Sequence, residues 1–104
     1  MEGLDGRLIR PSSATERVTA SRQVVLTPSW LYSVVLVSDS ENVADAAIYD
    51  GHNTGEELKV DITALDGDTK QLTFYPPLFM KKGIYVSVGS HVTSVVVQYS
   101  SVAE

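Results

Sequence analysis

Polar and apolar side chains alternate almost without a break along residues 57–65. The polar members are Glu57, Lys59, Asp61 and Thr63, and the apolar members are Leu58, Val60, Ile62 and Ala64. A period of two places successive side chains on opposite faces of an extended chain. The segment is therefore predicted to be a β-strand with one dry face and one wet face.

The same kind of pattern recurs along most of the chain, with turn residues between the runs. The further strand regions are predicted at residues 15–27, 30–38, 43–49, 70–75, 84–88 and 94–99. Among them, residues 30–38 are rich in β-branched and aromatic residues, which predicts a central strand buried on both sides. Seven or eight short strands in 104 residues predict one all-β domain, an antiparallel β-sandwich for which a jelly-roll topology is favoured.

Two dipeptides refine this prediction. Asp66-Gly67 is typical of a tight hairpin, because its turn needs a positive φ, and residues 70–75 would form the return strand. Pro76-Pro77 is expected to interrupt any central ladder, because neither residue has a backbone N–H to donate.

The N-terminal segment differs from the rest. Residues 1–14 contain two glycines and a proline and are predicted to be an extended arm, followed by the sandwich at residues 15–104. A frayed terminus is one interpretation. The other is an arm that contacts a neighbouring subunit, because Leu4, Leu8 and Ile9 are unusual in a purely solvated tail.

Composition excludes several classes of function. A net charge of −5 with only eight Lys and Arg residues disfavours nucleic acid as a partner. The chain has no cysteine, so disulfides and thiolate chemistry are excluded, and this fits folding in a reducing cytoplasm. No basic-then-apolar leader and no run of about 20 apolar residues is present, so neither secretion nor a membrane partner is expected.

No catalytic, cofactor-binding or metal-binding residues are predicted. The two histidines, His52 and His91, fall in turns without the spacing of a metal motif or a nucleophile elbow. Oxygen ligands for Ca²⁺ are available from Asp50, Asn53 and Glu56, but the EF-hand spacing is absent.

The aromatic residues of the chain are also consistent with a glycan-binding surface. The candidates are Trp30, Tyr32, Tyr49, Tyr75, Tyr85 and Tyr99. Tyr99 shares the parity of Val95 and Val97 and is predicted to lie in the core, whereas Tyr85 lies opposite Ile84 and is predicted to be exposed. Tyr85 and Val96 suit an oligomer or partner contact at least as well as a ligand.

Three segments carry a resemblance to a known group of proteins. They read AIYDGHNTGEEL at residues 47–58, FYPPLFMKKGIYV at residues 74–86 and VGSHVTSVVVQY at residues 88–99. Together they resemble small β-sandwich virion structural proteins of tailed bacteriophages, in which an IYD loop precedes one strand and a P-x-x-F-x-K-G segment precedes a final VTVxY strand. The likeness covers residues 30–100, about two-thirds of the chain.

This resemblance implies a non-enzymatic virion protein, most simply a capsid decoration or cement subunit, assembled in the host cytoplasm. Its partners would be its own copies in a homo-oligomer and other virion proteins such as the major capsid protein, with no cofactor. A neck or tail component and a glycan- or surface-binding β-sandwich module remain as alternatives. The predicted contact residues are Leu4, Leu8, Ile9, Tyr85 and Val96.

Overall fold

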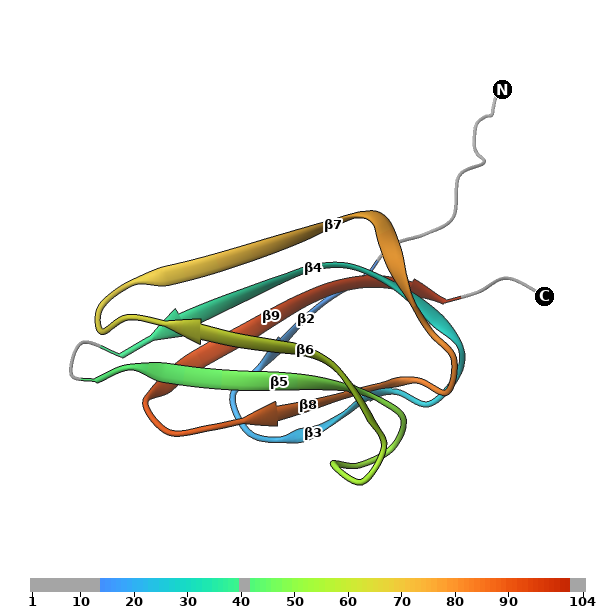
Figure 1. Ribbon diagram of the computed structural model, residues 1–104, viewed down its shortest axis with the longest axis horizontal. Helices are drawn as coiled ribbons and strands as arrows, with labels where there is room; N and C mark the ends of the chain where they lie inside the picture. Colours follow the sequence, from blue (N-terminus) through green and yellow to red (C-terminus); the bar gives the residue numbers. More distant parts are fainter. Residues whose placement is uncertain (1–13, 40–41, 102–104) are drawn as a thin grey trace.

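The computed structural model describes residues 14–39 and 42–101, which form two four-stranded sheets packed face to face (Figure 1). The strands are β2 (Ala14–Val18), β3 (Arg22–Val25), β4 (Ser29–Ser38), β5 (Ala44–Asp50), β6 (Glu57–Ala64), β7 (Thr69–Met80), β8 (Ile84–Val88) and β9 (Val92–Ser101). The predicted all-β sandwich is confirmed. Within the described ranges, no helix has the length and apolarity needed to cross a membrane.

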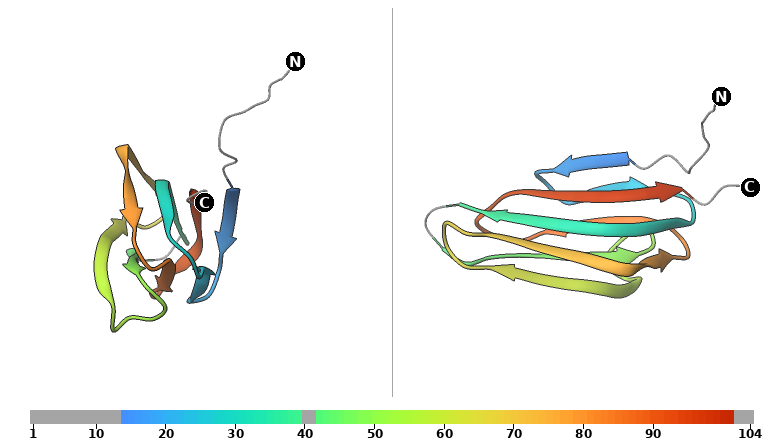
Figure 2. Two further views of the ribbon diagram at one scale, coloured as in Figure 1. Left: turned by 90° about the vertical axis from the view of Figure 1, so that its right-hand side faces the viewer. Right: turned by 90° about the horizontal axis from the view of Figure 1, so that it is seen from above.

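The strands pair in a nested order. One sheet has the order β2-β9-β4-β7 and the other β3-β8-β5-β6, and every pairing is antiparallel (Figure 2). Thus β5 pairs with β6, β4 with β7, β3 with β8 and β2 with β9, as in one long hairpin. Rolling that hairpin sends successive pairs to alternate sheets, which is the jelly-roll arrangement predicted from the sequence.

Residues 15–27 form two strands rather than one strand region. β2 belongs to one sheet and β3 to the other, so the chain crosses the sandwich at residues 19–21. The Ser21 hydroxyl holds this crossing in place by accepting a hydrogen bond from the backbone N–H of Val88 at 2.8 Å. β2 begins at Ala14, the last residue of the predicted arm, and residues 1–13 lie outside the described part of the chain.

The turn at Asp66-Gly67 exists, but the predicted hairpin is wrong. Gly67 has a φ of 75°, and the N–H of Asp68 donates to the carbonyl of Leu65 at 2.9 Å. However, β6 pairs with β5 and β7 pairs with β4, so this turn carries the chain from one sheet to the other. The N–H of Gly67 donates to the carbonyl of Asp39 at 2.8 Å, which ties the turn to the end of β4.

The core lies between the two inner faces. Leu31, Val34 and Leu36 of β4 are fully buried and meet Ile48 of β5 and Val86 of β8 within one cluster. β4 is central, as predicted, but it is buried on one side only. Its outward side chains are partly exposed, because no other element of the described residues covers that face of the sheet.

The predicted dry face of β6 is confirmed at Val60, Ile62 and Ala64, all of which are buried. Leu58 is the exception, with 48% of its surface exposed. The pairing of β5 with β6 shifts register between Ile48 and Tyr49, and this irregularity takes Leu58 out of the alternation.

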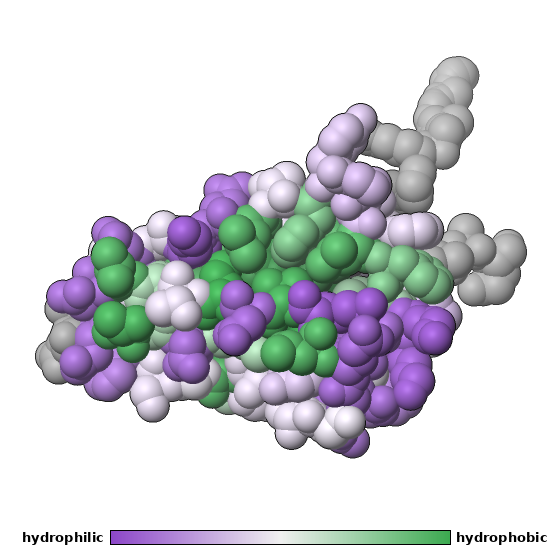
Figure 3. Space-filling model, in the orientation of Figure 1, coloured by the Kyte–Doolittle hydropathy of each residue, from purple (hydrophilic) through white to green (hydrophobic). Residues whose placement is uncertain are grey.

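Edge strands β6 and β7 border one open side of the sandwich. Seen from this side, hydrophobic residues gather along the middle of the molecule, between the two sheets (Figure 3). Leu72, Phe74 and Leu78 of β7 pack against the core here but remain partly exposed. The two sheets therefore cover their shared core incompletely along this edge.

Candidate functional site

A wide bulge interrupts β7 on the outer face of the β2-β9-β4-β7 sheet. Thr73 pairs with Ser33 and Leu78 pairs with Leu31, so four residues of β7 face the single residue Tyr32 of β4. These four residues include the predicted chain breaker Pro76-Pro77, and the Tyr75–Pro76 peptide bond is cis. The β4–β7 ladder is interrupted at these residues, but β7 is an edge strand with no partner on its other side, and the strand continues to Met80.

The bulge carries the most exposed aromatic ring among the described residues. Tyr75 has 98% of its surface exposed, whereas Phe79, the other exposed aromatic residue of β7, has 41% of its surface exposed. Tyr75 continues the outward alternation of Gln71 and Thr73, and the bulge beside it separates this part of β7 from β4. Tyr75 therefore projects from the sheet instead of packing on it.

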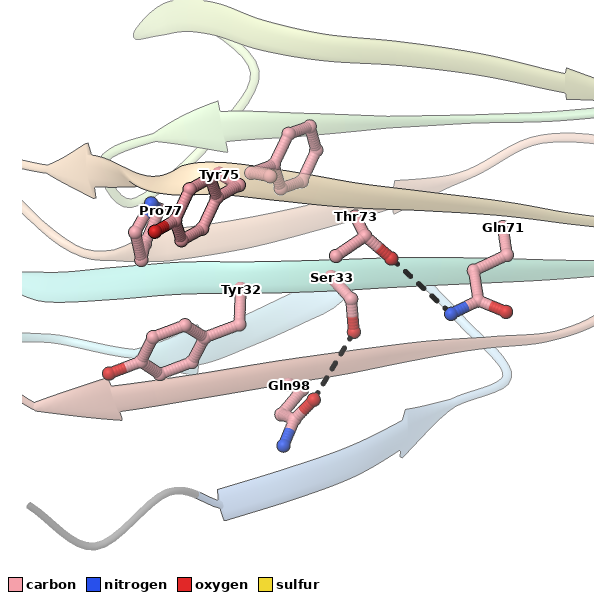
Figure 4. A pocket seen from close by; sticks show the side chains of 8 residues that line it. Tyr32, Ser33, Gln71, Thr73, Tyr75, Pro77 and Gln98 are labelled. Carbon is pink, nitrogen blue, oxygen red and sulfur yellow. Dashed lines mark hydrogen bonds between the residues drawn. The ribbon is translucent and has the colours of Figure 1, made fainter. Parts of the chain in front are cut away.

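A depression of about 440 Å³ lies beside this ring, with its lining drawn from three strands (Figure 4). Its lining residues are Tyr32, Ser33, Gln71, Thr73, Phe74, Tyr75, Pro77 and Gln98. In the close view, the rings of Tyr75, Pro77 and Tyr32 lie at one end, and the polar side chains of the lining lie at the other.

Few internal hydrogen bonds hold this lining. The Tyr32 hydroxyl and the Ser100 hydroxyl lie 2.9 Å apart and share a hydrogen bond, which orients the Tyr32 ring. Two further bonds are long: Gln71 Nε2 donates to Thr73 Oγ1, and Ser33 Oγ donates to Gln98 Oε1, each at 3.4 Å. Bonds of that length are weak, so both amides can exchange them for a ligand.

The lining can bind but offers little for acid–base chemistry. None of its eight side chains carries a carboxylate, an imidazole or an amine. Rings, hydroxyls and amides provide apolar contact together with paired donors and acceptors. Such a set favours recognition of a neutral, polar ligand.

A second exposed aromatic group lies farther along the same sheet. Trp30 of β4 and Phe79 of β7 pair across the strands with ring centroids 4.9 Å apart and planes inclined by 48°. Trp30 is 38% exposed, and its partner in β9 is Ser100. The pair thus lies next to the end of β9, at the end of the molecule where both termini leave (Figure 1).

The predicted contact residues are divided between two surfaces. Tyr85 lies on the outer face of the β3-β8-β5-β6 sheet, between Gln23 and Tyr49, and is half-buried. Val96 lies on the outer face of the opposite sheet and is also half-buried. The structure does not bring them together. Leu4, Leu8 and Ile9 lie outside the described residues.

The loop considered for Ca²⁺ has a structural role instead. The Asp50 carboxylate is buried and accepts hydrogen bonds from the backbone N–H of Lys81 at 2.9 Å and of Lys82 at 2.7 Å. We call this contact the Asp50 clasp, because it joins the β5–β6 loop to the β7–β8 turn. Asn53 Oδ1 accepts from the N–H of Gly55 at 2.7 Å, which is an ordinary turn interaction.

An ion pair lies over the clasp. Lys82 Nζ donates to Glu56 Oε1 at 3.0 Å. The hydrogen bond from Lys82 lowers the pKa of Glu56, and the same bond raises the pKa of Lys82. The three candidate Ca²⁺ ligands are therefore each engaged with a donor of the protein, and residues 14–39 and 42–101 contain no group of three His, Cys, Asp or Glu side chains placed to hold a metal ion.

Both histidines lie on the surface. His52 is exposed in the β5–β6 loop. His91 has a φ of 62°, and its Nδ1 lies 3.2 Å from Asp39 Oδ2. Both members of this pair are partly exposed, and the contact closes the β8–β9 turn against the end of β4.

The depression and the clasp differ in how far the sequence pointed to them. Tyr75 was one of six aromatic candidates, and parity placed it on the face of β7 opposite Leu72 and Phe74. The prolines after it were the available signal for a bulge, but neither signal singled out Tyr75 from the other candidates. Asp50 was considered only as a metal ligand. Its partners are backbone N–H groups 31 and 32 residues away. The pattern of side-chain types along the sequence cannot predict such a long-range contact with the backbone.

Comparisons of the chain with protein-family models, with curated proteins and with solved structures found no match. The surfaces described above therefore carry the functional argument.

Proposed function

We propose that this chain is a non-enzymatic structural subunit of a tailed-bacteriophage virion, with a capsid decoration or cement role favoured over a neck or tail role. It acts by contacts with its own copies and with other virion proteins such as the major capsid protein. The proposal joins the resemblance of three sequence segments to a surface suited to assembly.

The observation that carries the proposal is the exposed Trp30–Phe79 pair. Large aromatic side chains are enriched where proteins meet and are depleted from surfaces that only face water. Trp30 pairs with Ser100, so the pair lies beside the C-terminal end of β9.

The apolar side between β6 and β7 gives further support. Two sheet edges border it, and hydrophobic residues remain visible along it (Figure 3). A neighbouring copy that covers this side would protect the edges and remove apolar surface from water. The jelly-roll order is also common among viral capsid domains, which supports the proposal by analogy of fold alone.

The Asp50 clasp gives the first two segments of the resemblance a shared physical role. Asp50 belongs to residues 47–58, and its partners Lys81 and Lys82 belong to residues 74–86. A motif pair that fastens a loop to a turn is what a family of structural subunits needs, and it requires no catalytic residue.

Size-exclusion chromatography with light scattering tests the assembly role on the full chain. We expect a homo-oligomer whose mass falls toward that of the monomer in Trp30→Ser and Phe79→Ser. Val43→Ser is the matched control, because Val43 is 49% exposed but lies before β5, at the opposite end of the sandwich. A second arm of the test is cosedimentation with capsids of the phage that encodes the chain. A strict monomer that also fails to bind these capsids contradicts the proposal.

A further inference from the structure

We propose that the depression beside Tyr75 is a binding site for a neutral oligosaccharide. This inference does not rest on the virion role, because it follows from the outer face of one sheet in a single copy of the chain. The sequence offered six aromatic candidates for a glycan surface without grouping them. The structure separates Trp30 from Tyr85, which face outward from opposite sheets, and brings two of the candidates, Tyr32 and Tyr75, together in one depression.

The aromatic end of the depression provides the apolar contact. A sugar ring has one or two faces made of C–H groups, and these pack on the face of an aromatic ring. The β7 bulge holds Tyr75 almost fully out of the protein, while Tyr32 is fixed through Ser100. The two rings lie at the same end of the depression with Pro77 (Figure 4). The Tyr32 ring, which Ser100 holds in place before binding, loses little conformational entropy when the ligand arrives.

The polar end provides the directional contacts. A sugar hydroxyl donates one hydrogen bond and accepts others, and a primary amide likewise offers both an N–H₂ and a carbonyl. Gln71 and Gln98 flank the depression with Ser33 and Thr73 between them. The side-chain hydrogen bonds of these four residues, within the described part of the chain, are the two contacts of 3.4 Å. Little free energy is therefore lost when a ligand replaces them.

Charge selects a neutral ligand. The eight lining side chains include no charged group, and the whole chain carries a net charge of −5. An anionic glycan or nucleic acid would meet no cation in the depression and would be repelled at long range. A cationic ligand would find no carboxylate in the lining to pair with.

A proline-rich peptide is the strongest competitor, because aromatic grooves also bind polyproline helices. Such a peptide presents carbonyl acceptors but few donors. The carbonyl oxygen of Gln71 would then lose water without a replacement donor, and that of Gln98 would keep only its long bond from Ser33, which is unfavourable. A saccharide satisfies both halves of each amide. The volume of about 440 Å³ lies within the range of roughly 300–1,000 Å³ typical of small-ligand sites, and it suits a short oligosaccharide.

The test is isothermal titration of the full chain with five neutral hexasaccharides, namely cellohexaose, maltohexaose, xylohexaose, mannohexaose and chitohexaose, and with decaproline. We expect at least one hexasaccharide to bind with a Kd of roughly 1 mM or tighter. Tyr75→Ala and Gln98→Ala should each weaken that binding about tenfold or more, whereas Tyr75→Phe should stay within about threefold of the parent chain. Tyr75 is exposed, so its variants are expected to fold normally.

Tyr85→Ala is the matched aromatic control on the opposite sheet, and it should leave the affinity unchanged. Three results would overturn the proposal. They are the absence of binding to all five hexasaccharides, binding that Tyr75→Ala and Gln98→Ala leave intact, and binding of decaproline in place of the sugars. None of these results bears on the oligomer mass or on capsid binding, so the two proposals fail separately.

Discussion

Removing the Asp50 carboxylate should destabilise the whole sandwich. Asp50 ends β5, and its two oxygens accept the backbone N–H groups of Lys81 and Lys82 just after β7. Only 4% of the residue is exposed, so water cannot replace the carboxylate without entering the packed end of the sandwich. Asp50→Ala therefore leaves two N–H donors without their acceptor.

The size of the effect follows from the two bonds. A hydrogen bond to a charged group contributes about 1.5–3 kcal/mol net, so the loss of two gives about 3 kcal/mol at the lower limit. A domain of this length has a free energy of unfolding of roughly 5–15 kcal/mol, so Asp50→Ala should still fold. Asp50→Asn keeps the side-chain volume and one acceptor oxygen. Its free energy of unfolding should therefore lie between those of the parent chain and Asp50→Ala.

Urea unfolding measures the change. Trp30 fluorescence and far-ultraviolet circular dichroism should give coincident curves, as a two-state transition requires. With a slope of about 1.5 kcal/mol per molar urea, a loss of 3 kcal/mol lowers the midpoint by about 2 M. Asp61→Ala is the control, because Asp61 lies exposed on β6 and its replacement should change stability by less than about 0.5 kcal/mol. A loss below about 1 kcal/mol for Asp50→Ala, or an equal loss in the control, would refute the structural role of the clasp.

Four other substitutions test separate parts of the fold. Gly83→Ala should cost about 2 kcal/mol or more in a urea titration, because its Cβ would lie 2.4 Å from a backbone oxygen of β3 and its φ is +142°. Gly67→Ala, with a φ of +75° but open space around it, should cost only about 1 kcal/mol. Leu36→Ala should cost about 2–5 kcal/mol by leaving a cavity in the core, and calorimetry would measure the drop in Tm. Glu56→Gln should remove the stabilisation that the ion pair with Lys82 provides. Because the pKa of Glu56 is lowered in the folded protein, this stabilisation is fully present above pH 4.5 and is lost as the pH falls through the folded pKa. The urea midpoints of the variant and the parent should therefore converge in acid. Urea midpoints that stay apart at a pH below the folded pKa of Glu56 would contradict a stabilising role for its ion pair with Lys82.

The alternation of apolar and polar residues predicted the strands well, because burial acts on each strand separately. Val60, Ile62 and Ala64 point into the core, and so do the alternate residues of β8. Turn residues also marked most connections. The sequence could not show where a turn leads, because Asp66-Gly67 serves a crossing between sheets as readily as a hairpin.

The candidate site depended on pairing, and pairing is a long-range property. The depression joins Tyr32 of β4, Tyr75 of β7 and Gln98 of β9, residues separated by 43 and 23 positions in the chain. Their proximity follows from the nested jelly-roll order, and the bulge beside Tyr75 separates this part of β7 from β4. Single-strand periodicity does not contain this proximity, so the aromatic candidates could be assigned to faces but not grouped into one site.

The two proposed surfaces share one edge strand, which makes a coupling experiment informative. Phe79 and Tyr75 both lie on β7, and the Asp50 clasp fixes the turn that follows this strand. If a neighbouring copy covers Phe79 without reaching the depression, Phe79→Ser and Tyr75→Ala should act independently, the first on oligomer mass and the second on saccharide affinity. If the neighbour also borders the depression, the double variant should differ in affinity from the combined single effects by more than about 0.5 kcal/mol. Independent effects would identify the saccharide site as a property of one subunit, whereas coupled effects would mean that a second copy completes it.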